Sequence, residues 1–217
     1  MSAVVDRPVR FADVGAIVFD VGGVLLALRP EDSFAAFAAL GADGFERIWQ
    51  QDTPGKSLHR FEVGDIDVDQ FRREVCEDLG KALPAEAFDA AFGAMLGPIA
   101  DVHFELLGKL SADMPLYVLS NNNTLHLSAI EARYPAFRGL FQQAWFSQEI
   151  RLRKPDPQAF FSTLERGQLE ARRTLFVDDS LANVQAARAA GMQALHLPRN
   201  GDLVAALKGC LPSTLGL

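Results

Sequence analysis

The chain has 217 residues, 49% of them hydrophobic, which is enough to bury the core of one domain with an insertion or of two small domains. Its formal net charge of −7 argues against nucleic acid and anionic membrane surfaces as partners, because both attract clustered positive charge. The sequence contains no run of about 18 apolar residues, so we expect no membrane-spanning segment.

The N-terminal segment, the cysteines and the histidines carry little sign of a special function. Residues 1–15 lack the apolar centre of a signal peptide and look like a loose leader before the first strand. Cys76 and Cys210 are far apart in the sequence, which gives no sign of a disulfide framework or a thiolate metal site. The histidines lack metal-ligand spacing, so His103 and His126 are expected to be ordinary helix-face residues. We therefore expect a protein of the reducing cytoplasm.

Apolar runs of strand length alternate with helix-like stretches along most of the chain. The expected strands are 16–19, 116–119, a weaker one at 144–147, 174–177 and 193–197. The expected helices are 101–110, one that follows Asn123, one that begins at Pro155, and 181–190. This alternation is typical of parallel strands joined by right-handed crossovers. The predicted fold class is therefore α/β, with a doubly wound, Rossmann-like parallel sheet.

One long stretch, residues 31–96, breaks this alternation. It contains no strand-like run, and its apolar residues fall at helical spacing on both sides of a turn at 61–66. We therefore expect a helical cap domain at 31–96, inserted as a lid over the end of the first strand. The core domain would consist of residues 1–30 and 97–217. Substrate specificity should lie in the cap. The apolar helix faces of the cap could pack on the core or on another subunit, so the oligomeric state stays open.

Polar residues interrupt three of the apolar runs at their C-terminal ends. Asp20 follows the first run, Ser120 follows the second, and Asp178 with Asp179 follows a third. In a parallel sheet these ends lie at one edge, which is where ligands bind. Acid and hydroxyl groups gathered at one edge suit a hard cation and a phosphate.

Four motifs occur in order along the chain. They are Phe19-Asp20-Val21-Gly22-Gly23-Val24-Leu25, Leu119-Ser120-Asn121, Lys154-Pro155-Asp156 and Phe176-Val177-Asp178-Asp179. Together they resemble the motifs of the haloacid dehalogenase-like hydrolase superfamily, and details such as Arg153-Lys154-Pro155 are similar to the branch that contains α-glucose-1-phosphate phosphatase and the phosphatase domain of soluble epoxide hydrolase. The resemblance implies a Mg²⁺-dependent phosphomonoester hydrolase that works through an aspartyl-phosphate. Its substrate would be a small phosphorylated metabolite, with a sugar 1-phosphate suggested by the branch.

The resemblance assigns Asp20 as the nucleophile, since a carboxylate that attacks phosphorus divides one difficult displacement into two easier ones. Asp20 is also an expected Mg²⁺ ligand, together with Asp179, the carbonyl oxygen of Gly22, and Asp178 either directly or one layer further out. Asn183 could orient one of these carboxylates or be an exposed amide. The acidic pair could also merely cap the helix that follows it.

A second group of residues is expected to bind the phosphoryl group. Ser120 and the backbone N–H of Asn121 would hold its oxygens. Lys154 would offset the negative charge of Asp20 and of the phosphoryl group, and Pro155 would fix its direction by starting a helix. Taken alone, a Ser at a strand end suggests a helix cap and a Lys before Pro suggests a surface residue. The surrounding motifs favour the functional assignments.

Gly22 departs from the family pattern. Most phosphatases of the superfamily carry a second Asp at this position as general acid and base, a contribution typically worth about 10²–10⁴-fold in rate. The substrate could have a leaving group that departs easily, such as an anomeric hydroxyl, or Glu62 or His59 of the cap could supply the proton. The protein could also be slow or non-catalytic. Glu62 lies in a turn of the cap, where it could reach the substrate or be a solvated surface charge.

Three other functions compete with a phosphatase. A 2-haloacid dehalogenase also lacks the second Asp, but its carbon–halogen displacement needs no Mg²⁺, so the pair Asp178 and Asp179 counts against it. A phosphoacceptor receiver domain carries its acidic pair on the first strand, whereas here the pair comes last. A non-catalytic phosphate-binding regulatory protein stays open because of Gly22.

Overall fold

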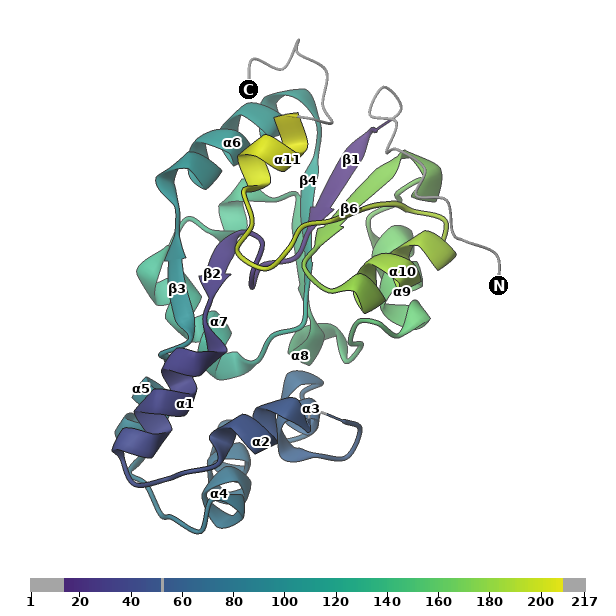
Figure 1. Cartoon of the computed structure of the whole chain (residues 1–217). Coiled ribbons are helices and arrows are strands. Elements are labelled where there is room, and N and C mark those ends of the chain that lie inside the picture. Colours follow the sequence, from purple (N-terminus) through teal and green to yellow (C-terminus); the bar gives the residue numbers. More distant parts are fainter. Residues whose placement is uncertain (1–13, 52, 209–217) are drawn as a thin grey trace, which may run out of the picture.

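The computed structural model describes residues 14–51 and 53–208, and within them a five-stranded parallel sheet forms the centre of the protein (Figure 1). Its strands are β1 Ala16–Phe19, β4 Leu116–Ser120, β5 Gln143–Phe146, β6 Thr174–Asp178 and β7 Gln193–His196. The strand order is β5-β4-β1-β6-β7, and each neighbouring pair is parallel. The predicted strands and the α/β fold class are confirmed.

Helices cover both faces of this sheet. They are α6 Asp101–Asp113, α7 Thr124–Arg133, α8 Ser147–Ile150, α9 Pro157–Arg166, α10 Leu181–Ala189 and α11 Leu203–Lys208. Ile17 and Phe19 of β1 pack with side chains of α6, α7 and α11, whereas Ala16 and Val18 pack with side chains of α9 and α10. Alternate residues of one strand thus supply two cores, which explains why the strands are apolar along their whole length.

The helix expected to begin at Pro155 begins two residues later. α9 starts at Pro157, and the side chain of Asp156 caps it by accepting a hydrogen bond of 2.8 Å from the backbone N–H of Gln158. An acid at the cap followed by proline in the first turn is a favoured helix start. Pro155 therefore lies in the preceding turn, and the expectation that it starts the helix is wrong.

The segment between the first and second sheet strands is helical, as predicted. It comprises α1 Pro30–Ala39, α2 Phe45–Gln50, α3 Ser57–Glu62, α4 Val68–Asp78 and α5 Ala85–Gly93, which together we call the helical insert. Figure 1 shows it at one end of the molecule, below the sheet. It has an aromatic core of its own, in which Phe37 stacks on Phe45 and Phe61 on Phe71 with ring centroids 4.3 Å apart in each pair.

Two short strands that the sequence analysis did not predict join the helical insert to the rest. β2 Leu26–Leu28 pairs with β3 Leu96–Ile99 in an antiparallel ribbon. Gly97 and Pro98 are residues typical of turns, which hid β3 in the sequence. In the structure Gly97 allows the two strands to approach closely, since a Cβ there would lie 2.9 Å from a backbone oxygen of β2. The last residue of the stretch 31–96 therefore belongs to strand β3. The division of the chain into a cap domain at 31–96 and a core domain stays a prediction.

Some expectations concern residues outside the described ranges. Residues 1–13 of the expected leader and Cys210 lie there, whereas Cys76 is a free, half-buried cysteine. Among the helices of residues 14–51 and 53–208, none combines the length and apolar character needed to cross a bilayer.

His126 is a buried contact between α7 and the helical insert, not the ordinary helix-face residue that was expected. Its ring stacks on Phe92 of α5 with centroids 4.1 Å apart, and Nε2 lies 3.2 Å from the Phe92 carbonyl oxygen. Nδ1 lies 3.1 Å from the side-chain amide nitrogen of Asn123, the N-cap of α7. Burial lowers the pKa of His126 to about 4, against the opposing effect of the bond to Phe92.

We expect this neutral histidine to make the protein less stable in acid. The pKa of His126 is about 4 in the folded chain and 6.5 ordinarily, so between these values the unfolded chain binds the extra proton. The free energy of unfolding should therefore fall as the pH drops through this window. His126→Gln should lose roughly 2–3 kcal/mol of that pH dependence. Urea unfolding of both proteins from pH 7 to pH 4 measures the difference, and parallel curves would contradict it.

Candidate active site

Asp20, Ser120 and Asp178 come together at one edge of the sheet. Asp20 directly follows β1, while Ser120 and Asp178 are the last residues of β4 and β6. β1 lies between β4 and β6, so the three side chains extend from neighbouring parallel strands. The backbone N–H of Val21 donates a hydrogen bond of 2.7 Å to Asp20 Oδ1, which fixes the carboxylate as the chain leaves the sheet.

Lys154 lies between two of these acids. Its Nζ is 3.0 Å from Asp20 Oδ1 and 2.6 Å from Asp178 Oδ2. The lysine is only 2% exposed, which removes the reading of Lys154 as a surface residue. It also lies over the ring of Phe176, with Nζ 5.2 Å from the centroid. A buried ammonium group is thus fixed between two carboxylates and an aromatic face.

The pKa values of Asp20 and Lys154 reflect this crowding. Burial raises the pKa of Asp20 to about 7, with Lys154 opposing the shift and the charges of Asp178 and Asp179 adding to it. Burial alone would lower the pKa of Lys154, but the charges of Asp178 and Asp20 outweigh it and raise that pKa above its ordinary value. The lysine therefore stays protonated. The positive charge around Asp20 is not enough to keep the pKa of that carboxyl at its ordinary value.

Asp178 is held from several sides. The side-chain amide of Asn183 donates to both of its carboxylate oxygens, at 3.0 and 3.1 Å. The backbone N–H of Ser180 donates to Oδ1 at 2.8 Å. Asp178 is fully buried, so these bonds and the Lys154 ion pair satisfy a carboxylate that water does not reach. Of the two readings of Asn183, the orienting amide is the one that the structure bears out.

Asp179 occupies the outer side of the site. Its Oδ2 accepts a hydrogen bond of 2.8 Å from Nε of Arg199. The same oxygen would lie 2.6 Å from a Cβ added at Gly23, where φ is +80°. Glycine is therefore needed there both for the backbone conformation and for the space that the carboxylate fills.

These acids form a donor set for a metal ion. Asp20, Asp178 and Asp179 each offer a carboxylate oxygen within 4.8 Å of those of the other two. An all-oxygen set with excess negative charge fits a hard divalent cation such as Mg²⁺, which would offset both the burial and the repulsion that raise the pKa of Asp20. Gly22 lines a hollow together with Asp20 and Asp179, so its backbone is close to the donor set.

Asn121 connects the second motif to the third. Its side-chain amide donates to the Lys154 carbonyl oxygen at 2.8 Å, and its Oδ1 accepts from the Lys154 backbone N–H at 2.9 Å. This pair of bonds fixes the backbone of Lys154, a function of the Asn121 side chain that the sequence analysis missed. Ser120 is buried at the strand end, where its Oγ makes a long contact of 3.4 Å with the Asn121 carbonyl oxygen.

A hollow of about 210 Å³ opens beside Asp20 and runs between the sheet edge and the helical insert. We call it the Asp20 hollow. Glu62 lines it from α3 and is only 7% exposed, so the reading of a solvated surface charge does not hold. Glu62 Oε2 lies 2.7 Å from Nε of Arg153, which lines the hollow from the loop before α9. Glu62 is the last residue of α3 and not part of a turn as expected, because the helix continues one residue past Phe61 before the turn begins. The end of α3 thus contacts the core next to Lys154.

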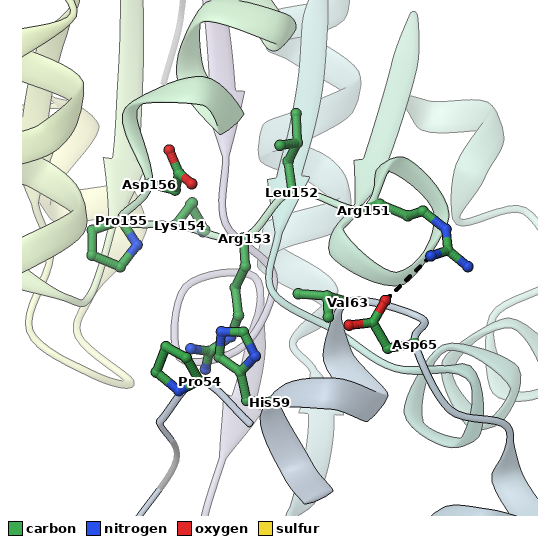
Figure 2. Close-up of a pocket in the computed structure, with 10 residues that line it drawn as sticks. All are labelled: Pro54, His59, Val63, Asp65, Arg151, Leu152, Arg153, Lys154, Pro155 and Asp156. Atoms are coloured by element: carbon green, nitrogen blue, oxygen red, sulfur yellow. Dashed lines mark hydrogen bonds and ion pairs between the residues drawn. The ribbon is translucent and has the colours of Figure 1, made fainter. Parts of the chain in front are cut away.

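His59 lines an adjoining hollow and is not among the residues around the Asp20 hollow. Figure 2 shows this adjoining hollow, where Arg153 extends from the core toward His59 and Pro54 of the segment around α3. A second contact closes its far side, with Nη1 of Arg151 3.2 Å from Oδ1 of Asp65. Arg153 and Lys154 line both hollows.

The sequence analysis missed the functional position of two arginines. Arg153 was noted only as part of a motif, and Arg199 was not considered. Arg199 follows β7 and so lies at the same sheet edge as the acids, which was a usable signal. Arg153 meets Glu62 only because the helical insert folds back over the sheet, and no local pattern reveals that contact.

The family model for haloacid dehalogenase-like hydrolases matches residues 14–191. The chain is similar to the sesquiterpene phosphatase astK of Aspergillus oryzae, with 30% identity over 84% of this chain and 89% of that protein. It is also similar to the D-ribitol-5-phosphate phosphatase of Bacteroides thetaiotaomicron, with 25% identity over 85% of this chain and 92% of that protein.

A solved structure agrees with these relatives. The HAD family enzyme BT-2542 of Bacteroides thetaiotaomicron, crystallised in complex with magnesium and inorganic phosphate, superposes with a TM-score of 0.80 and 27% identity. The match covers 87% of this chain and 96% of that chain. Fold, ordered motifs and family match coincide over most of the sequence. The chain belongs to the haloacid dehalogenase-like hydrolase family.

Proposed function

We propose that the protein is a Mg²⁺-dependent phosphomonoester hydrolase that forms an aspartyl-phosphate on Asp20. The observation that carries this proposal is the buried Lys154 ammonium group between Asp20 and Asp178, with Asp179 beside them. A carboxylate nucleophile, a fixed positive charge and cation-binding acids are the parts that phosphoryl transfer to an acid needs. The phosphatase names of both relatives support the proposal.

The chain's own side chains would carry out the transfer. A carboxylate oxygen of Asp20 would bond to phosphorus as the bond to the ester oxygen breaks, and water would then attack phosphorus, release phosphate and restore the carboxylate. Lys154 Nζ, 3.0 Å from Asp20 Oδ1, would offset the charge of the phosphoryl oxygens. The hydroxyl of Ser120 and the backbone N–H of Asn121 would hold those oxygens in place.

The proposed Mg²⁺ ligands are Asp20, Asp179 and the carbonyl oxygen of Gly22. Asp178 is proposed to act one layer further out, because Lys154 already binds it at 2.6 Å. When bound, Mg²⁺ would supply positive charge opposite the phosphoryl oxygens. The magnesium in the BT-2542 complex supports this assignment.

Gly22 limits which esters the site can cleave well. With no carboxylic acid at this position, the departing oxygen receives little help from a proton donor. Aryl phosphates and sugar 1-phosphates both meet the resulting need for an acidic leaving group. We propose a small phosphorylated metabolite of this kind as the substrate, enclosed by residues 31–96 acting as a lid.

Replacing the nucleophile tests the mechanism directly. Asp20→Asn keeps the shape of the side chain but not a usable nucleophile, so turnover of p-nitrophenyl phosphate should fall roughly a thousandfold or more. Removal of Mg²⁺ with EDTA should have a comparable effect on the wild type. Asp101→Asn, an exposed acid at the start of α6, is the control and should keep its activity. An Asp20→Asn variant that folds normally and keeps near wild-type turnover would exclude the covalent route.

A graded series of esters tests the consequence of Gly22. The logarithm of kcat/KM should rise steeply as the leaving-group pKa falls, because the departing oxygen must carry its negative charge unprotonated. Gly22→Asp should flatten this dependence. A Cβ at Gly22 meets nothing closer than Leu28, at 3.4 Å, so the variant has room to fold. A flat dependence in the wild type would show that another residue supplies the proton.

The helical insert offers a matched pair of acids. Glu62, the last residue of α3, holds Arg153 beside the Asp20 hollow, whereas Asp65, in the turn that follows α3, makes an exposed pair with Arg151. Glu62→Gln should lower kcat/KM about tenfold by releasing Arg153, since close, desolvated charge pairs are worth more than exposed ones. Asp65→Asn should change it less than about twofold. Equal effects of the two variants would mean that Glu62 only attaches the insert to the core.

A further inference from the structure

Three apolar side chains line part of the Asp20 hollow. They are Leu28 at the end of β2, Trp49 of α2 and Leu58 of α3. Leu58 is buried, whereas Leu28 and Trp49 are partly exposed. All three pack against the aromatic core of the helical insert, so that core extends to the surface of the hollow.

The polar side chains around the hollow already bind one another. Glu62 pairs with Arg153, and Asp179 with Arg199. Asn121 bonds to the backbone of Lys154, whose ammonium group pairs with Asp20 and Asp178, and Asn183 bonds to Asp178. These pairs use part of the hydrogen-bonding capacity of the side chains, so a sugar or polyol would compete with them for donors and acceptors, whereas an apolar body would not.

Trp49 distinguishes this wall from ordinary interior packing. Trp49 packs against the insert's core and also lines the hollow next to Asp20. Its neighbour Ile48 packs against the same core but lines a different hollow, with Arg47 and Gln51 on the outer side of the insert. Helix α2 therefore presents Trp49, and not Ile48, to the site.

We propose that the substrate is a phosphate monoester with an apolar body next to the ester oxygen, such as an aryl phosphate, in preference to a sugar or polyol phosphate. The inference rests on the proposed phosphatase function and narrows it, because it makes the sugar 1-phosphate the poorer of the two candidates. The apolar surface of Leu28, Trp49 and Leu58 would bind the body by excluding water, and the acid-rich end would bind the phosphate.

The matched ligands cyclohexylmethyl phosphate and glucose 6-phosphate test this inference. Both carry a six-membered ring on a primary phosphate ester, and they differ chiefly in ring hydroxyls. Binding is measured by calorimetry to the Asp20→Asn variant with Mg²⁺, so that turnover is not needed. We expect cyclohexylmethyl phosphate to bind at least about tenfold more tightly. Equal affinity, tighter binding of glucose 6-phosphate, or no binding of the cyclohexyl ester overturns the inference.

A second set of variants locates the effect at Trp49. In the Asp20→Asn background, Trp49→Gln should remove most of the preference for the cyclohexyl ester, while Trp49→Phe should restore much of it. Ile48→Ala is the control from the same helix and should leave the preference within about twofold. If the preference for the cyclohexyl ester survives Trp49→Gln, the apolar surface of Leu28, Trp49 and Leu58 does not bind the body of the substrate and the inference is overturned. Turnover of p-nitrophenyl phosphate by the wild type tests the proposed function separately, so the two failures can be told apart.

Discussion

The ammonium group of Lys154, buried between Asp20 and Asp178, is the interaction on which the rest of the site depends. A buried charge is tolerated only where partners surround it, and breaking such a pair by removing one partner costs about 3–5 kcal/mol. Asn121 fixes the backbone of Lys154, and Asn183 fixes Asp178. Residues from β1, β4, β6 and the loop before α9 therefore have to adopt one arrangement together.

This arrangement leaves the site short of positive charge. Burial raises the pKa of Asp20 to about 7, Lys154 opposes this shift, and the charges of Asp178 and Asp179 add to it. The folded protein therefore keeps Asp20 in an environment that disfavours its ionised form, which is the form that the proposed mechanism requires. A bound cation would relieve this cost, so the proposed metal binding and nucleophile activation would be coupled through the same carboxylate.

The sequence predicted the parts of this structure that depend on local pattern. Continuous apolar runs identified the sheet strands, and the polar residues after them identified Asp20, Ser120 and Asp178 because parallel strands end at one edge. The ribbon of β2 and β3 was missed because its strands are short and because Gly97 is a residue typical of turns. The Glu62–Arg153 pair was missed because its partners are distant in sequence and meet only when the insert folds over the sheet.

The absent acid at Gly22 and the apolar wall of the helical insert have one physical consequence in common. In the proposed reaction, a leaving oxygen next to Leu28 and Trp49 would depart unprotonated beside apolar surface, which does not solvate its charge. The guanidinium groups nearest to it, on Arg153 and Arg199, are already paired with acids. The charge is then best accommodated within the leaving group itself, by delocalisation into an attached ring. An apolar aromatic body satisfies the wall and the missing acid together, whereas a sugar satisfies only the second.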